Sequence, residues 1–105
     1  MKQNPAVAKC CPELQAALDP KLFHALADQN RLVLLMRLVA SEEPQTVSQL
    51  ADCCGVHLSG VSRHLAMLRD AGILDAEKHG REVRYQLRRA QLAQTLHLIA
   101  NAINT

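Results

Sequence analysis

One segment of this chain departs from the helical spacing of its hydrophobic residues, and that segment restricts the fold more than any other feature. Apolar and polar residues alternate from 82 to 87, which is the period of a β-strand, and the preceding segment KHGR (78–81) suits a turn. Residues 73–87 are therefore predicted to form a β-hairpin. Because the apolar residues on either side follow helical spacing instead, we expect a mainly α-helical fold with one small β-hairpin.

The chain before this hairpin carries local signals for helix starts. Pro12 and Pro20 each suit a first helical position, and Asp19 is a good N-cap. These signals predict helices near 12–18 and 20–28, either separate or as one kinked unit.

Three further helices are expected. Residues 31–40 (RLVLLMRLVA) are apolar almost all round and predict a buried helix. Thr46 and Gln49 have the spacing of a capping box, which begins a short helix over 46–54. The last helix is expected over about 88–104.

Two short helices joined through a glycine precede the hairpin. The first ends at Gly55, and the second is predicted over about 59–71, with Gly72 at its end. A helix pair of this kind places its second helix in the major groove of DNA. The order of helices, helix–turn–helix, hairpin and last helix predicts a winged helix–turn–helix fold.

At 105 residues the chain is long enough for one domain, whose small core is expected to be completed by self-association. We predict an N-terminal arm over 1–11 and a winged-helix domain over 12–105, with terminal helices that form a homodimer. The last helix carries an apolar stripe at helical spacing. The residues of this predicted dimer interface are Leu92, Leu96, Ile99 and Ile103.

Composition excludes several classes of protein. The chain has no apolar run of about 18 residues and no hydrophobic N-terminal segment, so membrane partners and secretion are not expected and the cytoplasm is the predicted location. Phe23 and Tyr85 are the only aromatic residues, which argues against binding to RNA or single strands. The chain has no glycine-rich phosphate loop and no nucleophile–base spacing, so neither an enzyme nor an organic cofactor is expected.

The charge distribution favours double-stranded DNA as the partner. Residues 57–105 hold seven Lys and Arg against four Asp and Glu, so an anionic partner is expected on this half. Early in the second helix, Arg63 can bind guanine bidentately and Gly60 lets the backbone approach the duplex. Ser59 and Ser62 can bind phosphate or base edges. The residues expected to hold flanking phosphates are Arg69, Arg81 and Arg84.

The chain resembles the ArsR/SmtB family of metal-sensing winged-helix repressors in three stretches: HALADQNRLVLLMRL (24–38), LADCCGVHLSGVSRHLAMLRDAGIL (50–74) and GREVRYQL (80–87). The resemblance covers nearly the whole chain after Pro20. It implies a homodimer, built on the first and last helices, that represses a resistance-type operon by binding a palindromic operator. It also implies a wing tip at 79–81. The DNA-facing residues that it implies are Ser59, Ser62, Arg63 and His64, with His57 directly before them.

The four cysteines form two adjacent pairs, Cys10-Cys11 and Cys53-Cys54. In a cytosolic chain structural disulfides are not expected, which leaves metal binding, redox chemistry or core packing. The first pair stands directly before a helix start, where N–H groups and the helix dipole favour the thiolate. On a helical projection Cys54 falls on the buried face and Cys53 at its boundary, so Cys53 is the better ligand of the two.

The resemblance also bears on the ligand that these thiols bind. Some arsenic sensors of the family join an N-terminal Cys-Cys pair to a third cysteine of the other subunit. Other members carry a zinc site on the last helix, which here offers only His97 and no acidic residue. Trivalent arsenic takes three thiolates, and cadmium or lead three or four. We therefore expect a thiophilic metal or metalloid to release the repressor, arsenite first and cadmium or lead next.

Three other interpretations of the cysteines remain open. The same fold with a thiol-based redox or persulfide response is the main alternative, and incidental thiols in an ordinary repressor are another. From a different class, a thiol metal carrier or protein-interaction module would explain the cysteines but not the basic second half.

Overall fold

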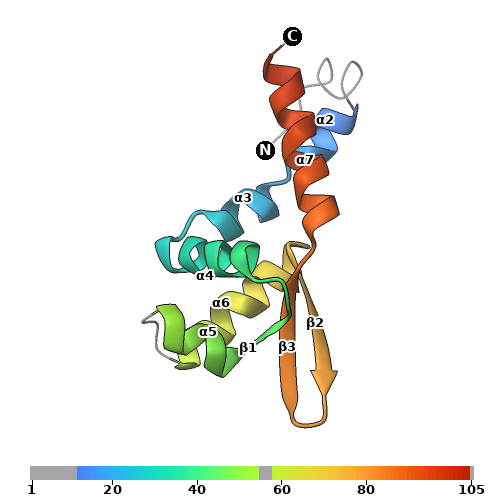
Figure 1. The fold of residues 1–105 in the computed structure, drawn as a ribbon. Helices are drawn as coiled ribbons and strands as arrows, with labels where there is room; N and C mark the ends of the chain where they lie inside the picture. The colour runs from blue at the N-terminus through green and yellow to red at the C-terminus, as the bar shows by residue number, and fades with distance from the viewer. Residues whose placement is uncertain (1–11, 55–57, 105) are drawn as a thin grey trace.

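The N-terminal part of the computed structural model consists of three helices, and aspartate caps begin the second and the third of them. The structure describes residues 12–54 and 58–104. The helices are α2 (Pro12–Ala17), α3 (Pro20–Leu26) and α4 (Gln29–Ala40) (Figure 1). Asp19 caps α3 as predicted, because its side chain accepts a hydrogen bond from the N–H of Lys21 at 3.1 Å. The expected arm, residues 1–11, lies outside the described residues.

Asp28 caps α4 in the same way, which corrects two predicted boundaries. Its Oδ1 accepts from the N–H of Asn30 at 2.8 Å and from that of Arg31 at 3.1 Å. A capping residue has extended rather than helical backbone angles, so the chain leaves one helix and begins another at this point. The helix expected over 20–28 therefore ends at Leu26, and α4 begins at Gln29 instead of residue 31.

α4 is buried on one face only, which corrects the expectation of a fully buried helix. Leu34 and Leu38 are 0 % and 2 % exposed and belong to the core. A second side of the helix is apolar but open to solvent in the single chain, because α3, α5 and α6 cover only the first side. The large apolar residues of α4 that are exposed are Leu32, Met36 and Val39.

The helix–turn–helix is formed by α5 (Val47–Cys54) and α6 (Leu58–Asp70). The predicted capping box is confirmed. The N–H of Thr46 donates to Gln49 Oε1 at 2.8 Å, and the N–H of Gln49 donates to Thr46 Oγ1 at 3.2 Å. α6 begins one residue earlier than expected. It ends in a Schellman motif, in which Gly72 adopts a φ of 81°.

A three-stranded antiparallel sheet follows, with the order β1-β3-β2. The predicted hairpin is confirmed as β2 (Leu74–His79) and β3 (Glu82–Leu87), and it turns at Gly80 with a φ of 62°. The two-residue strand β1 (Gln45–Thr46) was not expected. It pairs with β3 at Tyr85 and Arg84 and so attaches the hairpin to the start of the helix–turn–helix.

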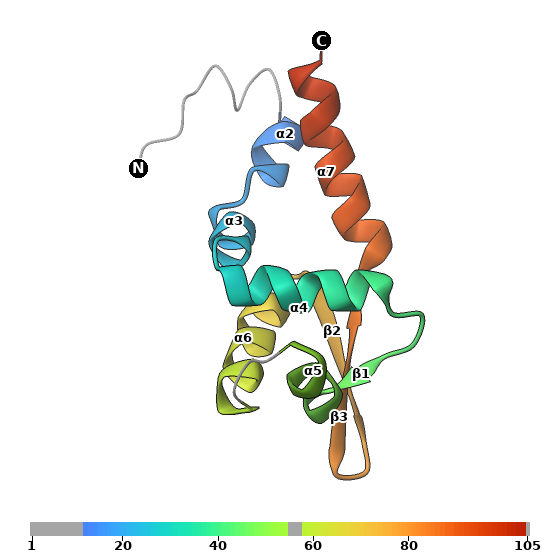
Figure 2. The same cartoon turned by 60° about the vertical axis from the view of Figure 1, so that its left-hand side comes forward.

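The last helix, α7 (Arg89–Ile103), lies beside α2 at the end of the molecule opposite the hairpin turn (Figures 1 and 2). No residue of α7 is buried, whereas the helix–turn–helix and the hairpin share a continuous core. The fully buried large side chains of this core are Leu34, Leu50, Val61, Leu65, Leu68, Ile73 and Leu74.

No helix in the described part of the chain is long and apolar enough to cross a membrane.

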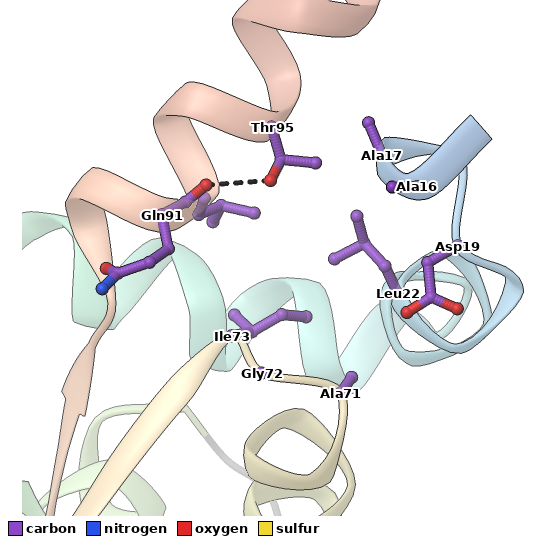
Figure 3. Close-up of a pocket in the computed structure, with 10 residues that line it drawn as sticks. Ala16, Ala17, Asp19, Leu22, Ala71, Gly72, Ile73, Gln91 and Thr95 are labelled. Carbon is purple, nitrogen blue, oxygen red and sulfur yellow. Dashed lines mark hydrogen bonds between the residues drawn. The ribbon is translucent and has the colours of Figure 1, made fainter. Parts of the chain in front are cut away.

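A cavity of about 110 Å³ lies where α2, α3 and α7 meet the turn after α6 (Figure 3). Its walls include Ala17, Leu22, Ile73 and the half-buried Leu92. Ligand pockets commonly measure about 300–1,000 Å³, so this space is too small for most small molecules. It is a packing gap beneath the first turns of α7.

Candidate nucleic-acid interface

The recognition helix α6 has one buried side and one exposed side. Val61, Leu65 and Leu68 are each 0 % exposed and fix the helix against the core. Ser62 and Arg63 are exposed, as a base-reading or phosphate-binding role requires. Of the other predicted DNA contacts, Gly60 is half-buried within α6 and the side chain of Ser59 is not described. His57 lies outside the described residues.

A groove of about 330 Å³ joins the helix–turn–helix to the hairpin. It brings together two predicted DNA contacts, Ser62 of α6 and Arg81 beyond the end of β2. Thr46 and Ser48 line it from the start of α5, and neither was predicted as part of the site. The capping box was the available signal, because it marks a helix N-terminus, and N-terminal N–H groups attract phosphate.

A second groove, of about 360 Å³, lies between α3 and α6. Arg63 lines it together with Lys21 and His24, and the rest of its lining is Ala66, Met67, Asp70 and Ala71. Lys21 and His24 belong to residues 1–56, which hold five Lys and Arg against six Asp and Glu, and they are far from α6 in sequence. No local pattern indicates this contact, which exists only because α3 packs on α6.

Two of the predicted phosphate contacts hold carboxylate partners in the free chain. Arg69 pairs with Asp70 at 3.5 Å, and Arg84 pairs with Glu82 at 3.9 Å. Exposed ion pairs are worth only about 0–1 kcal/mol, so a DNA phosphate is able to replace the carboxylate. Arg81 is exposed at the hairpin turn, which suits a phosphate contact without such an exchange.

His64 is half-buried on the flank of α6 that faces Arg31 of α4. Its Nδ1 lies 3.3 Å from Arg31 Nη1, and Arg31 also approaches Asp28 Oδ2 at 4.0 Å. The N–H of Arg31 is the main cause that lowers the pKa of the Asp28 carboxyl below its ordinary value. The N–H of Asn30 and the nearby positive charge of Arg31 act in the same direction.

The predicted thiolate site lies outside the described side chains. Cys53 and Cys54 are the last two residues of α5, a position given by the backbone alone, and Cys10 and Cys11 precede residue 12. Within residues 12–54 and 58–104, no described group of three His, Cys, Asp or Glu side chains is placed to hold a metal ion. The cysteine assignment therefore stays a prediction.

The exposed face of α6, the hairpin beside it and the grooves on either side of α6, which hold Arg63 and Arg81, define a winged helix–turn–helix DNA-binding protein. A family model described as a helix-turn-helix domain matches residues 26–77. The chain is 35 % identical to the HTH-type transcriptional repressor SmtB of Mycobacterium tuberculosis, over 96 % of this chain and 77 % of that one. The chain belongs to the ArsR/SmtB family of transcriptional regulators. Because this is a family of transcriptional regulators, the membership confirms the prediction that the chain is not an enzyme.

Two further similarities concern ligand and fold. The chain is 38 % identical to the arsenic resistance transcriptional regulator ArsR1 of Pseudomonas putida, over 65 % of this chain and 52 % of that one. It also shares a fold with the homodimeric winged helix-turn-helix DNA-binding domain of a possible ArsR-family regulator from Mycobacterium bovis. That likeness has a TM-score of 0.65 and 21 % identity, and it covers 99 % of this chain and 90 % of the other.

Proposed function

We propose that this protein represses transcription by binding a palindromic operator as a homodimer, and that a thiophilic metal or metalloid releases it. The observation that supports operator binding is the convergence of exposed basic and hydroxyl side chains on two grooves that flank α6. Arg63 faces one groove, and Ser62 and Arg81 face the other. A helix flanked in this way can enter the major groove while its neighbours hold the phosphates on either side.

Within this interface Arg63 is assigned to base readout and Arg81 to phosphate. Arg63 is exposed in the first half of α6, the part of a recognition helix that reaches base edges. Arg81 is at the hairpin turn, where a wing meets the sugar–phosphate backbone. His57, Ser59 and Gly60 keep their proposed places at the start of α6. Arg69 and Arg84 are proposed to add phosphate contacts once they leave their carboxylate partners.

The homodimer is proposed to form through α7, whose apolar stripe a single chain does not cover. Leu96 is 45 % exposed and Ile103 is 77 % exposed, while Leu92 and Ile99 are half-buried. α2 is the element that packs most closely on α7 among the described residues. A second copy related by a twofold axis would bury these side chains and place two α6 helices on one operator.

The inducer is proposed to bind the cysteine pairs, with arsenite preferred and cadmium or lead next. Soft thiolates favour these ions over zinc bound to oxygen and nitrogen. A relative named for arsenic resistance supports the same class of ligand. Ligation by Cys10, Cys11 and Cys53 would tie the arm to the end of α5, directly before α6. A shift of α6 relative to its copy would spoil the spacing of the half-sites.

A mobility-shift titration on the DNA upstream of the protein's own gene tests this function. We expect binding of that DNA at concentrations that leave a scrambled duplex of equal length free. Addition of arsenite, cadmium, lead, zinc and peroxide in separate reactions then identifies the inducer class. Release by arsenite but not zinc supports the thiolate site, whereas release by peroxide alone supports the redox alternative. Equal affinity for operator and scrambled DNA contradicts the proposed repressor.

A further inference from the structure

Arg31 is a charged side chain that the core of the described residues encloses. It is 8 % exposed and is the buried polar or charged residue of the described part of the chain. Burial of a charge is costly unless hydrogen bonds replace the lost water, so its partners carry information about its role. All three nitrogen atoms of the guanidinium have a partner within 3.3 Å.

Two of these partners are at the end of α3. Nε donates to the carbonyl of Ala25 at 2.6 Å, and Nη2 donates to the carbonyl of His24 at 3.1 Å. Carbonyls in the last turn of a helix lack a full set of partners within the helix, and a cation there is also favoured by the helix dipole. Arg31 thus holds the end of α3 against the start of its own helix, α4.

The third partner is on the recognition helix. Nη1 lies 3.3 Å from Nδ1 of His64. A guanidinium has donors only, so Nδ1 must accept this hydrogen bond, and the ring proton must be on Nε2. Residue 31 thereby connects α3 and α4 to a single flank of α6. On that helix His64 is the direct neighbour of Arg63, the residue assigned to base readout.

We propose that Arg31 is a positioning residue for DNA recognition, which sets the rotation of α6 through its hydrogen bond to His64. The proposal rests on the function proposed above. The buried Val61, Leu65 and Leu68 decide which face of α6 meets the core. A hydrogen bond is directional, so the bond from the buried guanidinium to His64 narrows the remaining range of rotation about the helix axis. Loss of the bond widens that range and displaces Arg63 from its base.

A first test is spectroscopic and uses the wild-type chain. Long-range ¹H–¹⁵N NMR distinguishes a protonated from an unprotonated imidazole nitrogen. We expect His64 to show an unprotonated Nδ1 and a protonated Nε2, and R31K to lose this single tautomer, because a lysine ammonium does not reproduce the planar fork. R37K, a change at an exposed arginine of the same helix, should leave His64 unchanged. A mixture of tautomers in the wild type would overturn the proposal.

A second test measures discrimination, as the ratio of affinities for the operator and for an operator mutated at the base pair read by Arg63. H64A is expected to lose roughly tenfold of that ratio. H64N should retain most of it, because the asparagine Oδ1 takes the place of Nδ1 as acceptor. R31K should lower the ratio when it is introduced into the wild-type chain, but it should have no further effect when it is introduced into the H64A variant. His64 is half-exposed, so its variants are expected to fold even if R31K does not.

The outcomes distinguish failure of the role proposed for Arg31 from failure of the proposed repressor function. If the wild type does not discriminate, the repressor function fails and the role of Arg31 fails with it. If the wild type discriminates and R31K, H64A and H64N all discriminate equally well, Arg31 is a stabilising residue only and the proposal is wrong. Additive losses from R31K and H64A would also overturn it, because the two residues would then act independently.

Discussion

Arg89 and Ser41 join the last helix to the DNA-binding part of the molecule. Nη2 of Arg89, the first residue of α7, donates to the carbonyl of Ser41 at 2.6 Å, where α4 has just ended. The same nitrogen lies 3.1 Å from the carbonyl of Leu38 and 3.0 Å from that of Val39. One cation therefore occupies the carboxyl end of α4, where the helix dipole favours positive charge.

Arg89→Ala should destabilise the fold by about 1 kcal/mol, because the end of α4 loses its cation and shared hydrogen bonds at an exposed site. Urea unfolding followed by circular dichroism measures the change. Arg37→Ala removes an equal charge from the exposed face of the same helix and should have a smaller effect. Equal losses from the two variants would show that net charge, not the contact with Ser41, is responsible.

Leu96→Glu should convert the proposed homodimer to monomer. The side chain is 45 % exposed in the single chain and lies on the apolar stripe of α7, so a glutamate would become an unpaired charge in the dimer seam. Sedimentation equilibrium gives the mass directly. Gln94→Glu, a change on the opposite side of α7, is the matched control and should remain dimeric. A dimeric Leu96→Glu variant would place the interface elsewhere.

Arg63→Ala and Arg81→Ala should weaken DNA binding in different ways. Loss of Arg63 should cost about 1–3 kcal/mol and relax the preference at one base pair in each half-site. Loss of Arg81 should weaken all sequences alike and reduce the salt dependence of the affinity. Fluorescence anisotropy with single-base variants at several salt concentrations separates these effects. Sequence-blind losses of equal size in both variants would contradict the assignment.

Serine substitutions of the cysteines should separate sensing from stability. Cys10→Ser, Cys11→Ser and Cys53→Ser are each expected to bind operator normally but to resist release by arsenite or cadmium. Cys54→Ser should chiefly lower the free energy of unfolding, because that position is predicted to face the core. Operator release and thermal unfolding are measured on the same samples. A double variant of Cys10 and Cys11 that is still released normally would exclude the thiolate site.

Asp28→Asn should make the free energy of unfolding fall less steeply as the pH is lowered below about 4. The N–H of Arg31 lowers the pKa of this carboxyl from its ordinary 3.8, so ionised Asp28 stabilises the fold. That contribution is fully present above about pH 4 and is lost as the pH falls through the lowered pKa. Urea unfolding from pH 5 down to pH 2 checks this expectation, with Glu43→Gln as a control at an exposed loop carboxylate. Parallel curves for wild type and Asp28→Asn would contradict it.

The sequence predicted those parts of the fold whose causes are local. The capping box at Thr46 and Gln49 and the alternation that forms β3 each involve neighbouring residues, so a short stretch of sequence is enough to predict both. β1 was missed because two residues carry no period of their own. It exists only through pairing with Tyr85 and Arg84, about forty residues away.

The candidate site was predictable to a similar degree. Ser62 and Arg63 follow from their place early in a recognition helix, but the groove that Arg63 shares with Lys21 depends on how α3 packs. The burial of Arg31 was also missed, because an arginine at the edge of an apolar run usually reaches solvent. The aspartate three residues earlier was the available clue, since it marks a helix start at which Arg31 turns inward.

Both ends of α4 are held by arginines, Arg31 at the start and Arg89 from beyond the end. Each guanidinium holds three acceptors at once: Arg31 bonds to Ala25, His24 and His64, and Arg89 bonds to Leu38, Val39 and Ser41. A lysine at either place would lack the planar fork that makes this possible. The position of the recognition helix is thus tied, through α4, to both α3 and α7.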